Sequence, residues 1–125
     1  MWFNPPAGSE KKTRTFFLPP GYAKAIENNR VNLSSVVVTG VNRWYPLLLS
    51  SLPPAFSRWT ASGKIAGVRG VPAHNGWTRT SVYLDWETDT RIATILRIHK
   101  GFDLGRFVCQ LLHEANPRAF PGIMA

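Results

Sequence analysis

Residues 75–86 read NGWTRTSVYLDW, and this stretch decides the expected fold. Asn followed by Gly tolerates the positive φ angles of a type I′ turn, so Asn75-Gly76 predicts a β-hairpin between Lys64–Val71 and Trp77–Trp86. Successive strand side chains point to opposite faces. One face of the second arm therefore carries Trp77, Arg79, Ser81, Tyr83 and Asp85, and the other carries Thr78, Thr80, Val82, Leu84 and Trp86. The first face is polar and aromatic, whereas the second can be buried.

Working outward toward the N-terminus, other segments have the composition of strands. Thr13–Leu18 is rich in β-branched and aromatic residues, and Leu33–Val41 contains three consecutive valines. Arg43–Leu52 contains Pro46, which favours an edge strand or a loop because proline cannot donate to a ladder. Tyr22–Glu27 is expected to form a helical turn. Residues 1–100 are therefore predicted to form a strand-rich body.

Toward the C-terminus, Thr90–Ile98 fits either a strand or the start of a helix, and the following segment fits a helix well. Asp103 is a favourable N-cap, Asn116 can adopt the left-handed C′ conformation, and Pro117 cannot continue a helix. An apolar stripe with helical spacing consists of Leu104, Phe107, Val108, Leu111, Leu112 and Ala115.

These elements predict a single α+β domain over residues 1–125. An antiparallel sheet forms its body, and an amphipathic helix in the segment 101–125 packs on a sheet. No internal repeat is evident. No apolar stretch approaches the roughly 20 residues that span a bilayer, so we expect a soluble, cytoplasmic protein with no membrane partner.

The charge of the chain favours a polyanionic partner. Fifteen Lys and Arg against seven Asp and Glu give a net charge of +8, and 13 of the basic residues lie in residues 1–100. No run of five or six like charges occurs, so the cations belong to the expected strands and loops rather than to a disordered tail.

The residues with catalytic or metal-binding chemistry do not form a recognisable site. His74, His99 and His113 lack metal-ligand spacing, and Cys109, which lies off the apolar stripe, has no partner for an intrachain disulfide and no mark of an activated thiol. Cys109 is a candidate for a contact with another chain. The acidic cluster at residues 85–89 fits a strand end better than a Mg²⁺ or acid–base site. We therefore expect no enzyme, metal, cofactor or small-molecule substrate.

The polar strand face is instead a candidate RNA-binding surface. Tyr83 could stack on an unpaired base while Arg79 meets a phosphate, although a tyrosine that simply covers the sheet fits as well. The predicted RNA-binding residues are Arg43, Lys64, Arg69, Arg79, Ser81 and Tyr83, with Arg58, Arg91 and Arg97 as further cations.

In these features the chain resembles the coat proteins of small single-stranded RNA bacteriophages, the levivirus type. The resemblance rests on 79–85, on Val71-Pro72 before the hairpin and on 111–117, LLHEANP, and it covers mainly residues 64–125. It implies an interlocked homodimer in which each helix lies over the partner's sheet and the other sheet face meets RNA. Asp85 stands where such proteins have an RNA-contacting asparagine, and an ionised carboxylate cannot donate a hydrogen bond.

The leading hypothesis is thus a coat subunit that dimerises, assembles into an icosahedral shell and packages single-stranded RNA, located in the virion and, during assembly, in the bacterial cytoplasm. The alternatives are a small basic RNA-binding regulatory or ribosomal module, and a protein-binding inhibitor or adaptor. The residues predicted to make the dimer or helix packing are Val82, Leu84, Trp86, Leu104, Phe107, Val108, Leu111 and Leu112.

Overall fold

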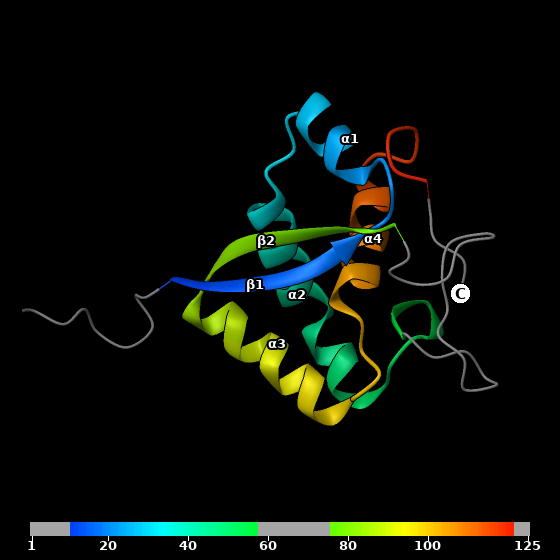
Figure 1. The fold of residues 1–125 in the computed structure, drawn as a ribbon. Helices are drawn as coiled ribbons and strands as arrows, with labels where there is room; N and C mark the ends of the chain where they lie inside the picture. The colour runs from blue at the N-terminus through cyan, green and yellow to red at the C-terminus, as the bar shows by residue number, and fades with distance from the viewer. Residues whose placement is uncertain (1–10, 58–75, 122–125) are drawn as a thin grey trace, which may run out of the picture.

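A computed structural model of the chain describes residues 11–57 and 76–121 (Figure 1). The fold of these residues has two layers. One layer is an antiparallel pair of strands, and the other is made of helices, so the α+β class is as predicted. The elements are β1 (Lys11–Leu18), α1 (Tyr22–Asn28), α2 (Leu33–Ser50), a 3₁₀ turn (Pro54–Phe56), β2 (Thr78–Asp85), α3 (Trp86–Ile98) and α4 (Leu104–Ala115).

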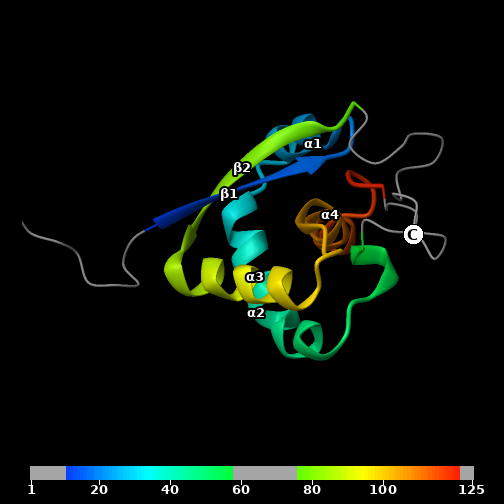
Figure 2. The same ribbon diagram turned by 60° about the horizontal axis from the view of Figure 1, so that its bottom comes forward.

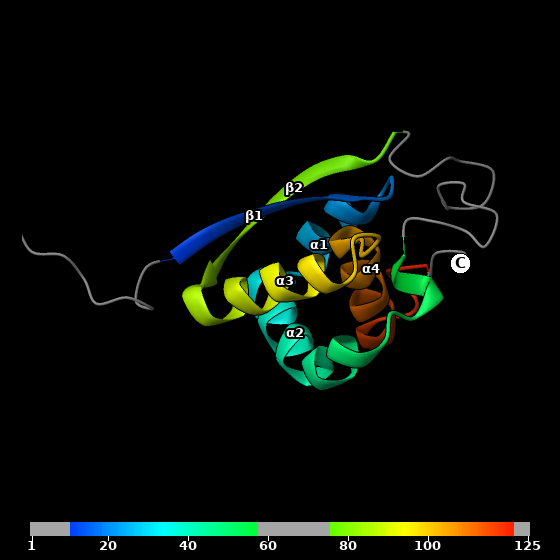
Figure 3. The same ribbon diagram turned by 90° about the horizontal axis from the view of Figure 1, so that it is seen from below.

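The two strands form a ribbon on one side of the molecule, and the helices lie on the other side (Figure 3). The register runs from Lys11 opposite Asp85 to Leu18 opposite Thr78. The strand faces alternate as the sequence predicts for β2, because every second side chain points toward the helices. The helix-facing residues at the core are Phe16, Leu18, Val82 and Leu84, all buried.

The strand partner of β2 in the described residues is β1, which the sequence predicted as a strand at Thr13–Leu18. The predicted partner, Lys64–Val71, lies outside the described residues, as does Asn75. Gly76 has a φ of 73°, which is the left-handed conformation expected of a turn glycine. The β1–β2 ribbon therefore joins segments some 65 residues apart in the chain.

Two tryptophans at the ends of β2 do not follow the predicted alternation. Trp77, expected on the polar face, precedes the strand and is only 6% exposed. Trp86, expected on the buried face, is 45% exposed because β2 ends at Asp85 and Trp86 is the first residue of α3. The side chain of Asp85 accepts a hydrogen bond from the amide of Thr88, so the N-cap of α3 ends the period-two pattern.

The strand prediction for Leu33–Val41 was wrong, as was the edge strand or loop predicted for Arg43–Leu52. The first segment and residues 43–50 of the second belong to the 18-residue helix α2. This helix begins where Asn32 caps the amide of Ser35, and it continues through Pro46. The buried residues of α2 are Val37, Gly40, Val41 and Leu48, and they recur at helical spacing. Burial of this stripe against α3 and α4 outweighs the β-propensity of the three valines. The body of residues 1–100 therefore contains three helices and two strands in its described part.

Helix α4 begins and ends where the sequence predicts. Asp103 caps the amide of Arg106, and the amide of Asn116 closes the helix on the carbonyl of Leu112. Asn116 has a φ of −151°, so the predicted left-handed end was wrong. Cys109 is fully buried in the core of its own chain, because the buried face of α4 is wider than the predicted stripe, and burial raises the pKa of its thiol.

The helix α4 packs on β1 of the same chain. The contact is close at Gly105, where an added Cβ would overlap the carbonyl oxygen of Phe17. The packing of this helix on a partner's sheet, and the homodimer itself, stay predictions.

Candidate nucleic-acid interface

The ribbon is built by two halves of the chain that have the same order of elements. β1, α1 and α2 form one strand–helix–helix unit, and β2, α3 and α4 form another (Figure 2). Two buried strand residues mark equivalent positions in each unit: Phe16 and Leu18 in β1, Val82 and Leu84 in β2. The structure thus contains an internal repeat that the residue letters did not reveal.

The helices support the same equivalence. Asn32 and Asp103 cap the second helix of each unit, and buried residues follow five and nine positions after each cap. These four residues are Val37 and Val41 in α2 and Val108 and Leu112 in α4. α2 contacts β2 and α4 contacts β1, so each second helix packs on the strand of the other unit.

An approximate twofold axis relates the two units, because equivalent residues meet each other at two places. Thr15 and Ser81 are opposite each other at the centre of the ribbon, with their hydroxyl oxygens 3.0 Å apart. Gly40 and Leu111 are equivalent positions of α2 and α4, and Leu111 lies against the Cα of Gly40. Contacts between equivalent residues at two places are what a twofold axis passing close to both would produce.

The outer face of the ribbon is a small surface on both sides of that axis. Its central pair, Thr15 and Ser81, is flanked by Thr13 opposite Tyr83 on one side and by Phe17 opposite Arg79 on the other. These six side chains are followed on the same side of β2 by Asp85, whose carboxylate caps α3. All six side chains are exposed, and Tyr83 is 67% exposed. Among the described residues, no helix covers this face (Figure 3). We call these six residues the ribbon face.

The structure brings together three of the six predicted RNA-binding residues, Arg79, Ser81 and Tyr83, and adds three from β1 that sequence reasoning missed. The period-two pattern of Thr13–Leu18 was the available signal, but nothing in it named β2 as the partner. Arg43 is exposed on α2, in a groove that Leu111 and Glu114 of α4 also line. Lys64 and Arg69 lie outside the described residues, as does Arg58.

Several other cations are engaged within the fold. Arg14, on the helix-facing side of β1, pairs with Asp89 of α3 at 2.6 Å. Arg91 pairs with Glu87 at 2.7 Å, donates to the side chain of Asn42 and lies over the ring of Tyr45. These contacts fasten α3 to β1 and to α2.

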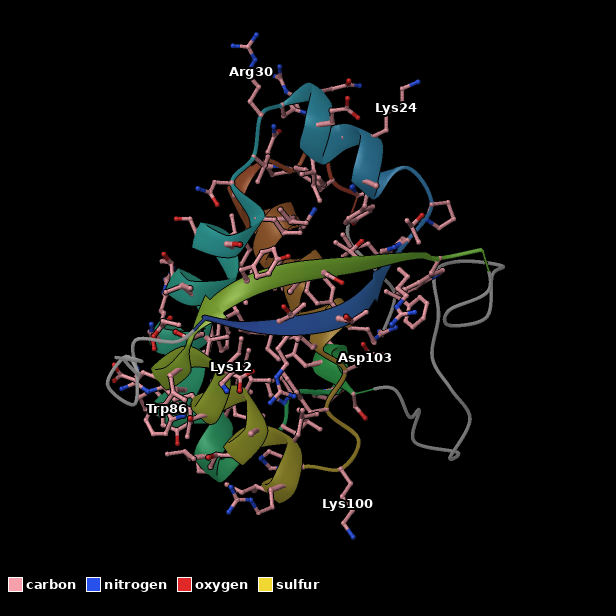
Figure 4. All side chains as sticks on the ribbon, turned by 60° about the vertical axis from the view of Figure 1, so that its left-hand side comes forward. Lys12, Lys24, Arg30, Trp86, Lys100 and Asp103 are labelled. Atoms are coloured by element: carbon pink, nitrogen blue, oxygen red, sulfur yellow. The ribbon has the colours of Figure 1, made fainter. Side chains whose placement is uncertain are left out.

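Exposed cations also lie away from the ribbon. Lys24 and Arg30 are at the α1 end of the molecule, and Lys100 follows α3 at the other end, with the ribbon between them (Figure 4). Each is exposed. These cations thus lie at both ends of the molecule, and Arg79 is the basic residue among the six of the ribbon face.

The predicted packing residues are buried inside one chain, with two exceptions. Leu111 is half-buried and Trp86 is exposed. The buried members of the set are Val82, Leu84, Leu104, Phe107, Val108 and Leu112.

The histidines in the described part of the chain make structural hydrogen bonds. His99 donates through Nε2 to the carbonyl of Leu48, and His113 donates through Nδ1 to the carbonyl of Phe120, each at 2.8 Å. No group of three His, Cys, Asp or Glu side chains within residues 11–57 and 76–121 is placed to hold a metal ion. His74 lies outside these residues.

None of the helices in the described ranges has the length and apolar character needed to cross a membrane. Comparisons of the chain with protein-family models, with curated proteins and with solved structures find no match in any of the three. The features of this chain that bear on its function are therefore the ribbon face and its symmetry.

Proposed function

We propose that this protein binds double-stranded DNA by inserting the β1–β2 ribbon into the major groove. The observation that carries the proposal is a two-stranded antiparallel ribbon whose outer face none of the described helices covers. This face carries an arginine, a tyrosine and hydroxyl side chains. The major groove of B-DNA admits a two-stranded ribbon, and base edges there present a distinct pattern for each base pair. The net charge of +8 supplies the attraction to phosphates.

The helix layer suits this role because it fixes the ribbon without covering its outer face. The buried strand residues anchor both strands to one core, and the ion pair of Arg14 with Asp89 ties β1 to α3. A ribbon held in this way has few internal motions to lose on binding, which favours affinity. Double-stranded RNA is a poorer ligand, since its major groove is too narrow for side chains to read.

The test is fluorescence anisotropy with the full chain and labelled duplex DNA, duplex RNA and single-stranded RNA of equal length. We expect salt-dependent binding that is tightest for duplex DNA. Arg79→Ala should weaken it by about 1–3 kcal/mol. Lys100→Ala removes the same charge away from the ribbon and is the matched control. Equal losses for the two variants, or no binding of duplex DNA, would contradict the proposal.

An RNA-packaging coat subunit is the second candidate, and the exposure of Tyr83 favours it because base stacking requires a free ring face. This candidate predicts large particles that contain RNA when the protein is expressed alone. Size-exclusion chromatography with absorbance at 260 and 280 nm and negative-stain microscopy distinguishes it from the DNA-binding protein. A small species without particles would remove the coat candidate.

A further inference from the structure

The two ends of the ribbon face have the same geometry but different chemistry. The approximate twofold axis through Thr15 and Ser81 exchanges Thr13 with Arg79 and Phe17 with Tyr83. Each end therefore presents an aromatic ring opposite one other side chain. That side chain is an arginine at one end and a threonine at the other. A homodimer would have identical ends, whereas one chain that contains both units need not.

We infer that the preferred DNA site is asymmetric, with a guanine contacted by Arg79 in one half and no equivalent guanine in the other. This inference rests on the proposed function. The symmetry of a DNA site follows the symmetry of the protein that contacts it. Here the fold has an approximate twofold axis, but equivalent positions of the ribbon face carry different residues, such as Thr13 and Arg79.

The chemistry of the side chains at each end of the ribbon face indicates which bases each half of the DNA site should contain. Arginine forms a bidentate pair with O6 and N7 of guanine, the commonest specific contact in the major groove, and the ring of Phe17 beside it suits the methyl group of a thymine. At the other end, Thr13 offers a methyl group and one hydroxyl, and Tyr83 offers a phenol. Each of these side chains has a single hydroxyl donor, so neither can donate two hydrogen bonds to O6 and N7 of one guanine.

Selection of duplexes from a random-sequence DNA library by the full chain, followed by sequencing, tests the inference. The expected result is one enriched motif that is not a palindrome, with a required guanine in one half only. Replacing that guanine should weaken binding on the order of 10- to 100-fold. Lys100→Ala should select the same motif as the unchanged protein.

Two variants change the motif in opposite ways. Arg79→Gln should replace the guanine preference with adenine, because glutamine pairs with N6 and N7 of adenine. Thr13→Arg places an arginine at the equivalent exposed position and should add a second guanine, so that the motif becomes close to a palindrome. Circular dichroism melting checks that both variants fold. Each variant tests a different half of the DNA site.

Binding with a palindromic motif, with no enriched motif, or with a guanine that survives Arg79→Gln would overturn the inference and leave the proposed function intact. Failure to retain any duplex would overturn both.

Discussion

The two strand–helix–helix units, residues 11–50 and 78–115, differ most where each strand connects to its first helix. In the first unit Pro19, Pro20 and Gly21 separate β1 from α1, and α1 has only seven residues. In the second unit α3 begins directly after β2 and has 13 residues. Gly21, with a φ of 88°, makes the turn in one unit, and the Asp85 cap makes it in the other.

For the second helices the difference in length is reversed, because the first unit has the longer helix: α2 has 18 residues and α4 has 12. The equivalent core positions are nevertheless all buried, and each second helix packs on the opposite strand. The two units therefore share buried positions, whereas their connections and most of their residue types differ. Substitutions at equivalent or neighbouring positions test whether the shared positions are also equivalent in energy.

The largest effect is expected at the equivalent core positions of α4 and α2. Leu112→Ala should lower the free energy of unfolding by about 2–5 kcal/mol, because Leu112 is only 1% exposed. Val41→Ala removes fewer buried atoms and should cost about 1.5 kcal/mol or more. Urea unfolding measures both. The neighbouring half-buried Leu111, changed to Ala, is the control, and a loss equal to that of Leu112→Ala would contradict the packing described.

The next effect concerns the close contacts of the two helices. Gly105→Ala should destabilise the protein by about 1–3 kcal/mol, because the new Cβ would overlap the backbone of Phe17, which cannot move alone. Gly40→Ala should cost less, since the obstacle is the end of the flexible Leu111 side chain and alanine favours a helix. Thermal unfolding of the two variants compares them. A larger loss for Gly40→Ala would show that the contact on the axis is the more rigid one.

The smallest effect is a pH dependence at the Asp85 cap of α3, where the first unit has Gly21 as the N-cap of α1. Hydrogen bonds from Thr88 lower the pKa of Asp85, so the ionised cap stabilises the fold above the ordinary carboxyl pKa of about 4. That stability is lost as the pH falls through the lowered pKa. The advantage of the unchanged protein over Asp85→Asn in urea unfolding should be present at pH 7 and shrink below about pH 4. A difference that stays constant with pH would contradict this cause.

Local signals in the sequence predicted much of the second unit. The alternation of β2, the Asp103 cap and the stripe of α4 each depend on residues close together in the chain. Arg79, Ser81 and Tyr83 were placed on one face for the same reason. The helix α2 was missed because Val36, Val37 and Val38 favour a strand locally, and only burial against α3 and α4 makes the segment helical.

By itself, the sequence determined the class of the fold, the charge of the protein and the two faces of β2, because periodicity and composition act over a few residues. The pairing of β1 with β2, the axis through Thr15 and Ser81 and the cross-packing of α2 and α4 were decided only by the tertiary structure. Those contacts join residues far apart in the chain, and their stability comes from burying two apolar layers together. The ribbon face exists only when both strands are in register.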